Sequence, residues 1–379
     1  MRVFKNKRLA GACLLVIGLL PMSRFAYNKL ANNWDMLAYM ALVMDVNVGN
    51  ADSVHSYVYA RFRESVPPET YTQLTATSPY RKLMATDPQA FYKQLPFYSV
   101  KPLYILFCKL CYAMGQTLTK ATVIPSVITF ILIGLLLYFW LSKYLKIWVA
   151  FIFSLLFMHC GFMLNSARLS SPDMLSAFFL LCSLYFTIEK PSVLGLFTFL
   201  LLSVFTRIDN LLFSICMITV CTFSGSWAKR ISLFNYLAMT GLLVAAYFII
   251  TTISSRAAFG ILYYPTFIHY FNSSYSYRET FSIKEYLTLL NAKLVAGFYS
   301  SSFLIFVLLG IMTTIHTVKS IRFQEIPFTS IICILVLLLS FVRFFMFPDL
   351  SDRFYLAYYA LIFIVLLKRF VLNEMKNKQ

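Results

Sequence analysis

The sequence predicts an all-α polytopic integral membrane protein with about ten transmembrane helices, within a range of nine to twelve. Of its 379 residues, 60% are hydrophobic and only 13% are charged, a composition outside the range of soluble globular proteins. Apolar stretches near the roughly 20 residues that cross a bilayer recur along the chain. No Gly/Ser linker or low-complexity tract divides it, so we expect one integral membrane domain over residues 1–379.

The candidate spans follow the chain in order, with short polar turns between most of them. They are 9–25, 121–142, 147–166, 172–189, 191–207, 210–226, 231–254, 294–318, 327–347 and 353–371. The first has a basic flank like a signal peptide, but Pro21-Met22-Ser23-Arg24 is a poor small-residue cleavage site. We therefore expect this segment to be an uncleaved anchor.

Charge predicts the orientation, although one segment leaves two solutions open. The stretch 102–117 is short and is interrupted by Lys109, so it either spans the membrane or lies in the interface. If it lies in the outer interface, the short loops on one side carry the basic clusters at 2–8, 143–146, 190, 229–230, 319–322 and 368–378. The positive-inside rule then places that side and both termini in the cytoplasm. If it spans, the clusters from 143 to 322 face outward.

On the first solution, two long loops lie outside a cell membrane of the cytoplasmic or inner type. The first extracytoplasmic loop covers 26–120, and its repeated prolines predict short interfacial helices. Within it, 34–46 has the pattern of an amphipathic helix that places Asp35 and Tyr39 on one face. The second loop covers 255–293 and is rich in aromatic residues, which are also favoured at membrane interfaces.

Several function classes are disfavoured by the distribution of charged and metal-ligating residues. The net charge is +18, but the basic residues are divided between helix ends and an external loop instead of forming one stripe, which argues against nucleic acid. Most of the eight cysteines fall inside predicted spans, and the four histidines are scattered. Neither a disulfide framework nor a metal site is predicted.

Acidic residues collect at the predicted outer surface. Asp35 opens the first loop, and Asp173 follows the turn that begins with Arg168. Pro172 suits the first turn of a helix and Asp173 its positive end, so a helix cap explains this turn as well as a site does. Ionisable residues at this depth are nevertheless costly and are often functional.

The order of these motifs resembles a known family. A first span, a loop that opens with an Asp and a Tyr four residues later, a Lys-Pro-Leu-Tyr helix start at 101–104 and an Arg-Leu-x-x-x-Asp turn at 168–173 follow one another. This order is similar to that of the superfamily C (GT-C) membrane glycosyltransferases, in the branch of protein mannosyltransferases and aminoarabinose transferases. The similarity covers about residues 1–210.

The resemblance implies a transferase that uses a sugar carried on a polyprenyl phosphate outside the cytoplasmic membrane. The acceptor is a lipid, a polysaccharide or a protein. By the resemblance, Asp35 is the base, Asp173 the acid of the second loop, and Lys101 a contact for the carrier phosphate. Many relatives place a second acid directly after the first, but Met36 stands here. We therefore expect no metal, and no cofactor besides the lipid-linked co-substrate.

The chemistry of phosphate departure explains why so few catalytic groups are expected. Phosphate leaves without protonation, so one carboxylate that deprotonates the acceptor and cations that hold the phosphate suffice. Direct displacement inverts the anomeric carbon. Candidate substrate contacts are Tyr39, Lys101, Arg168, Arg207, Arg256, Tyr263, Tyr264, Arg343 and Arg353.

Each of these residues also has a structural explanation. Arg207 has Asp209 nearby, and Arg353 has Asp349 and Asp352, so local ion pairs are the alternative. For the whole chain, a transporter or flippase of a lipid-linked or anionic solute shares the topology, but its helices should be broken around a midplane site. A noncatalytic scaffold and an envelope polymerase or ligase of another fold are the remaining alternatives.

Overall fold

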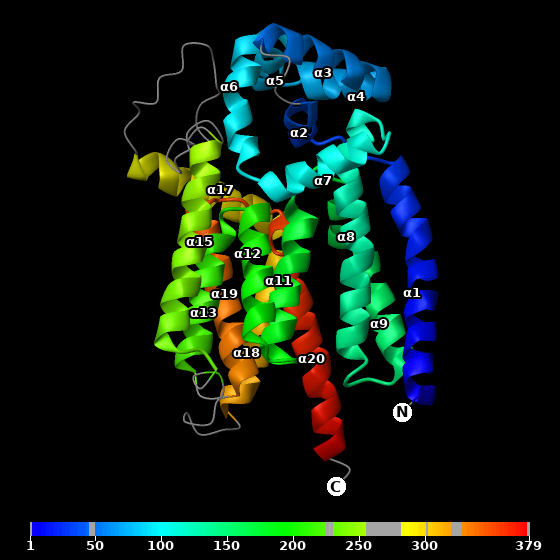
Figure 1. Ribbon diagram of the computed structural model, residues 1–379, viewed down its shortest axis with the longest axis vertical. Coiled ribbons are helices and arrows are strands. Elements are labelled where there is room, and N and C mark those ends of the chain that lie inside the picture. Colours follow the sequence, from blue (N-terminus) through cyan, green and yellow to red (C-terminus); the bar gives the residue numbers. More distant parts are fainter. Residues whose placement is uncertain are drawn as a thin grey trace.

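The computed structural model describes residues 2–44, 50–224, 227, 230–254, 282–300, 302–319 and 327–376. All regular structure in these ranges is helical. An upright bundle forms one end and the middle of the molecule, and a layer of shorter helices covers the other end (Figure 1). The predicted all-α class is confirmed.

The upright bundle contains both described ends of the chain. Its helices are α1 (Arg2–Asn28), α8 (Leu118–Leu141), α9 (Ile147–His159), α11 (Asp173–Ile188), α12 (Val193–Thr206), α13 (Asn210–Phe223), α15 (Leu233–Ile253), α18 (Phe303–Lys319), α19 (Phe328–Met346) and α20 (Leu356–Lys376). The first residues of α1 and the last of α20 lie at the same end, opposite the covering layer (Figure 1).

Among the described residues, four helices are long and apolar enough to cross a membrane. They are α1 from Lys7, α8, α15 and α19, and the number rises to six if each of two bent helix pairs is one span. α11, α12 and α13 are apolar but have only 14 to 16 residues. The chain is therefore a membrane protein with several spans, and the expected number of ten stays a prediction.

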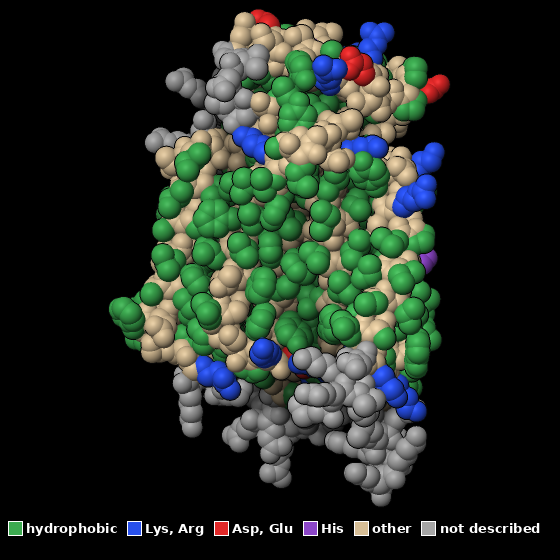
Figure 2. Space-filling model, turned by 45° about the vertical axis from the view of Figure 1, so that its right-hand side comes forward, with side chains coloured by type: hydrophobic (Ala, Val, Ile, Leu, Met, Phe, Trp, Pro, Cys, Tyr) green, Lys and Arg blue, Asp and Glu red, His purple; other side chains and the backbone are tan. Residues whose placement is uncertain are grey.

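The surface of the bundle matches this conclusion. Hydrophobic side chains cover the middle of the face drawn in Figure 2, and Lys and Arg side chains lie above and below them. Large apolar residues such as Leu9, Trp148, Phe234 and Phe248 are exposed. An exposed apolar belt of this extent fits lipid rather than water.

Two predicted spans are bent. The predicted span 147–166 is divided into α9 and α10 (Gly161–Ala167), which meet at 65°. The predicted span 294–318 begins too late, because α17 (Ile283–Ser300) starts eleven residues earlier and meets α18 at 84°. α17 therefore leaves the upright direction of the bundle, and the loop predicted over 255–293 ends inside a helix.

The covering layer consists of α3 (Ala51–Ser65), α4 (Pro68–Ala76), α5 (Pro79–Thr86) and α6 (Pro88–Ser99), which we call the cap. Pro68, Pro79 and Pro88 are the first residues of α4, α5 and α6, where their missing N–H is tolerated, whereas Pro96 lies inside α6. Ser78 and Asp87 cap α5 and α6 by accepting backbone N–H groups. The short helices expected in this part of the first loop are therefore present.

Two helices connect the cap to the bundle. α2 (Asp35–Met44) confirms the helix expected at 34–46, but it is not amphipathic at a surface, because Met36 to Ala41 are all buried. α7 (Pro102–Ala113) lies across the upper ends of the bundle helices rather than along them (Figure 1). This position agrees with the interfacial solution for 102–117.

Candidate functional site

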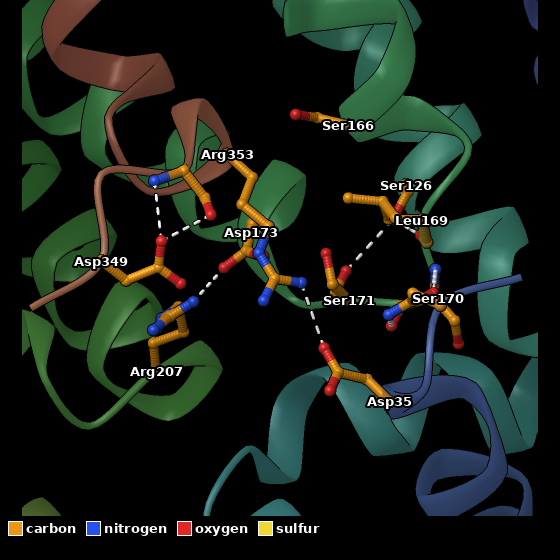
Figure 3. Close-up of polar contacts among 12 residues, drawn as sticks. Asp35, Ser126, Ser166, Leu169, Ser170, Ser171, Asp173, Arg207, Asp349 and Arg353 are labelled. Carbon is orange, nitrogen blue, oxygen red and sulfur yellow. Dashed lines mark hydrogen bonds and ion pairs between the residues drawn. The ribbon is translucent and has the colours of Figure 1, made fainter. Parts of the chain in front are cut away.

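Charged residues from six separate segments meet where the bundle touches the layer above it. Asp35 is the first residue of α2, and Asp173 is the first residue of α11. The others lie at helix ends or in the short helix η3 (Asp352–Phe354): Lys101, Arg207, Asp209, Arg343 and Arg353. Figure 3 shows Arg353 directed between the two carboxylates Asp35 and Asp173.

Arg353 joins the first loop to the bundle. Its Nη1 lies 3.1 Å from Asp35 Oδ2, and its Nε lies 3.6 Å from Asp173 Oδ2. Arg207 binds the other oxygen of Asp173. Asp173 is therefore held by two guanidinium groups and its side chain is only 2% exposed, which makes it a group that orients arginines.

Asp209 binds two of the three guanidinium groups, those of Arg207 and Arg343. Arg207 donates from Nε to Asp209 Oδ1 and from Nη2 to Oδ2, each at 3.0 Å, and Arg343 Nη1 lies 2.5 Å from Oδ2. Burial alone would raise the pKa of Asp209, but the charges of Arg207 and Arg343 hold it well below its ordinary value. Asp209 is a permanent anion of the cluster.

The three arginines share one aromatic ring. The guanidinium carbons of Arg207, Arg343 and Arg353 lie 4.9, 4.7 and 4.8 Å from the centre of the Phe354 ring. Such distances give favourable cation–π contacts. Phe354 thus gathers three like charges around itself while the carboxylates neutralise them.

Asp35 is the carboxylate that faces the cap, and the Asp209 side chain, which is held by two arginines, is 39% exposed. Its side chain is 26% exposed, and Tyr98 at the end of α6 donates to Oδ1 at 3.3 Å. Burial raises the pKa of Tyr98 and the charge of Asp35 raises it further, so this hydroxyl stays protonated. Tyr39, one turn along α2, packs edge-on against the Tyr98 ring at 5.4 Å.

Lys101 lies beside these two tyrosines. Its Nζ is 4.9 Å from the centre of the Tyr98 ring and 5.6 Å from that of Tyr39, and it donates to the Phe97 carbonyl at 3.2 Å. None of these contacts is an ion pair. Burial lowers the pKa of Lys101 to about 8, and the charge of Arg207 also lowers it, against the opposing effect of Asp35.

Hydrogen bonds between side chains and backbone groups fix the two loops that carry Asp35 and Asp173 to each other. The side-chain amide of Asn33 donates to the Ser170 carbonyl at 3.1 Å and accepts the Ser170 N–H at 3.0 Å. The Ser126 hydroxyl of α8 lies within 3.1 Å of the Leu169 and Ser171 carbonyl oxygens. The entrance to α2 and the turn before α11 are thereby fixed to each other (Figure 3).

A second set of contacts fixes η3. Asp352 accepts the Ser302 N–H at 2.7 Å, the Ser302 hydroxyl at 3.2 Å and the Tyr359 hydroxyl at 2.9 Å. It therefore anchors η3 to the start of α18. The local pairing expected between Arg353 and Asp352 is wrong, because Asp352 is used here and the ion pairs of Arg353 run to Asp35 and Asp173.

The structure brings together seven of the eleven candidate residues proposed from the sequence: Asp35, Tyr39, Lys101, Asp173, Arg207, Arg343 and Arg353. Arg168 is not among them, because its Nε donates to the Lys29 carbonyl at 2.5 Å and its guanidinium lies over Phe25. Arg256, Tyr263 and Tyr264 lie outside the described residues.

Three members of the cluster were not singled out as site residues. The sequence indicates Asp209 only as a local partner of Arg207, and it gives no role to Tyr98 or Phe354. The Arg-x-Asp spacing at 207–209 was a usable signal for Asp209. Nothing in the sequence places Phe354 among arginines from three segments.

Asp173 stands in the first turn of α11, where the helix-end explanation expects an acidic residue. Pro172 is the N-cap residue of α11, and no side chain makes a cap hydrogen bond there. The Asp173 carboxylate turns instead to Arg207 and Arg353. Within the described ranges, no group of three His, Cys, Asp or Glu side chains could hold a metal ion.

The arrangement offers a partly exposed carboxylate, a cation with no carboxylate partner among the described residues, and three oriented guanidinium groups at one end of a helical bundle. Such a set can hold an oxyanion and accept a proton. Comparisons with protein-family models, with curated proteins and with solved structures found no match.

Proposed function

We propose that this chain is a polyprenyl-phosphate-sugar-dependent glycosyltransferase. It transfers a hexosyl or pentosyl group to a hydroxyl or amine of a lipid, polysaccharide or protein acceptor. The observation that carries the proposal is the meeting of Asp35, an accessible carboxylate, with Lys101 and Arg353 at one end of an apolar bundle. A carboxylate beside oriented cations suits a reaction that removes one proton and releases a phosphate.

The residues divide the reaction between them. The acceptor oxygen forms a bond to the anomeric carbon, and its proton passes to Asp35. The bond from that carbon to the phosphate oxygen breaks, and its electron pair leaves with the phosphate toward Lys101 and Arg353. Asp173 and Asp209 orient Arg207, Arg343 and Arg353 for this purpose. Attack opposite the leaving phosphate inverts the anomeric centre.

The proposal includes a topology in which the reaction takes place outside a cytoplasmic or inner membrane. Ten spans are obtained if α11, α12, α13 and α20 cross together with the long helices and each bent pair counts once. Both described chain ends then lie in the cytoplasm, and the cap lies outside. The carrier's hydrocarbon chain reaches the site from the surrounding lipid.

The test is the release of polyprenyl phosphate by purified protein in lipid nanodiscs. A panel of polyprenyl-phosphate sugars is supplied with a membrane extract as acceptor, and Asp35→Asn is compared with wild type. Asp52→Asn is the matched control, because Asp52 is an exposed carboxylate at the start of α3 in the cap. We expect release by wild type and the control, and a loss of about a hundredfold or more in Asp35→Asn.

A transporter or flippase is the second candidate, and the two bent helix pairs favour it. Broken helices line the sites of many transporters. Here, however, the charged cluster lies at the ends of the helices rather than near their middle. Tight binding of a lipid-linked sugar without release of polyprenyl phosphate from any donor would support the transporter and overturn the transferase.

A further inference from the structure

Both carboxylate oxygens of Asp35 have partners in this structure. Arg353 binds Oδ2 at 3.1 Å, and Tyr98 donates to Oδ1 at 3.3 Å. The guanidinium neutralises the charge that a proton acceptor needs, and the same guanidinium is a candidate ligand for phosphate. A substrate phosphate and Asp35 therefore compete for one cation.

Asp35 is the carboxylate of the cluster with the fewest guanidinium contacts. Asp173 is 2% exposed and is bound by both Arg207 and Arg353, while Asp209 receives two hydrogen bonds from Arg207 and one from Arg343. Asp35 has one guanidinium contact, through one nitrogen. Losing this contact leaves Asp173 in place as a partner of Arg353.

Lys101 provides the second half of an anion site. It lies over the rings of Tyr39 and Tyr98, and its described contacts include no carboxylate. Tyr98 also touches Asp35, so the ammonium group and the Asp35–Arg353 pair face the same small region. A phosphate has enough acceptor oxygens to bind an ammonium and a guanidinium at once.

We propose that the donor phosphate binds between Lys101 and Arg353 and displaces Asp35 from the guanidinium. Asp35 is thereby released as the proton acceptor only after the donor is bound. This inference rests on the proposed function for its catalytic meaning, and it implies an ordered reaction in which the donor binds before the acceptor. Before the donor binds, Asp35 is paired with Arg353 and does not accept a proton from water.

The experiment measures binding alone. Dodecyl phosphate is the probe, and its dissociation constant is determined for the full-length protein in nanodiscs by isothermal titration calorimetry. Asp35→Asn removes the competitor, so we expect binding about five- to tenfold tighter than in wild type. Arg353→Gln should weaken binding about tenfold or more, because it removes the shared cation.

Asp349→Asn separates displacement from a general change in charge. The Asp349 carboxylate acts on Arg353 through its charge, but its hydrogen bonds run to Ser351. Asp349→Asn therefore removes one negative charge near Arg353, as Asp35→Asn does, but breaks no ion pair to Arg353. We expect it to change the dissociation constant of dodecyl phosphate by less than about twofold.

Equal tightening in Asp35→Asn and Asp349→Asn would overturn the displacement, as would weaker binding in Asp35→Asn with unchanged elution and melting temperature. The outcome does not depend on sugar transfer. Tightening specific to Asp35→Asn in a protein without transferase activity would leave the phosphate site standing and remove the proposed function.

Discussion

At the scale of single residues, the cluster is built so that its cations have unequal freedom. Arg207 and Arg343 share the carboxylate of Asp209, and their side chains are each 14% exposed. Arg353 shares its contacts between a buried and an accessible carboxylate. Lys101 has none. Arg353 is the most exposed of the three arginines, at 24%, and one of its two partners is the partly exposed Asp35. Exposure and partners together identify Lys101 and Arg353 as the groups that can respond to a ligand.

Lys101 should make phosphate binding depend on pH. Because its pKa is lowered to about 8, the ammonium is charged below pH 8 and neutral above it. The second ionisation of an alkyl phosphate, with a pKa near 6, is about 90% complete at pH 7 and only adds negative charge as the pH rises, so it does not cause a fall in affinity. We expect the affinity for dodecyl phosphate to fall severalfold between pH 7 and pH 9.5, measured by the same titration.

Lys101→Arg is the control for this prediction, because a guanidinium stays charged over the whole range. Its binding curve should be nearly flat with pH. An equal fall in wild type and Lys101→Arg would assign the pH dependence to another group.

The sequence predicted residue types at this site better than it predicted their partners. Arg207 and Asp209 are two positions apart, and their pairing was readable because the turn between two helices keeps them close. Asp35 and Arg353 are 318 positions apart. Their contact depends on how α2 and η3 are placed by the whole bundle, which local spacing does not encode.

At the scale of elements, the position of η3 depends on a close approach between α17 and the segment before η3. Gly297 of α17 faces Leu350, and an added Cβ would lie 2.4 Å from Leu350 Cδ1 and 2.6 Å from Leu350 Cβ. A side-chain rotation alone does not remove the second overlap. The segment that leads to Arg353 would have to move.

Gly297→Ala should therefore displace Arg353 by shifting the segment that leads to it. We expect a loss of stability of about 1–3 kcal/mol from overpacking, together with weaker binding of dodecyl phosphate. Gly241→Ala is the matched control, since nothing lies within 4 Å of an added Cβ there. Thermal unfolding and titration of both variants check the prediction, and indistinguishable behaviour would mean that Leu350 does not position Arg353.

Helix boundaries were predictable where polar or proline-containing turns interrupt the apolar sequence. The starts of α8, α11, α13 and α19 lie within three residues of the expected spans, because polar or proline-containing turns precede apolar runs. The bend between α17 and α18 was missed, since its first helix is apolar enough to resemble part of a span. Hydropathy reports which residues avoid water and not the direction in which a helix runs.

At the scale of the whole molecule, charged clusters occupy both ends of the bundle and differ in design. At the end opposite the cap, Glu189 binds Lys143 at 3.6 Å, Lys368 at 3.5 Å and the Tyr144 hydroxyl. This carboxylate is 7% exposed and ties α11 to α20 and to the turn after α8. It is an anchor, whereas Asp35 at the other end remains accessible.

We predict that the cap lies outside the membrane and that the opposite end of the bundle lies in the cytoplasm. Thr72 is exposed on the cap, and Lys190 is exposed just beyond the other end of α11. The positive-inside rule places Lys190 in the cytoplasm. In a background without the eight native cysteines, Thr72→Cys should react with an impermeant maleimide added to intact cells, and Lys190→Cys should react only after permeabilisation. Because the site lies beneath the cap, the reverse labelling pattern would place it in the cytoplasm. A donor that presents its sugar outside would then be unable to reach Asp35.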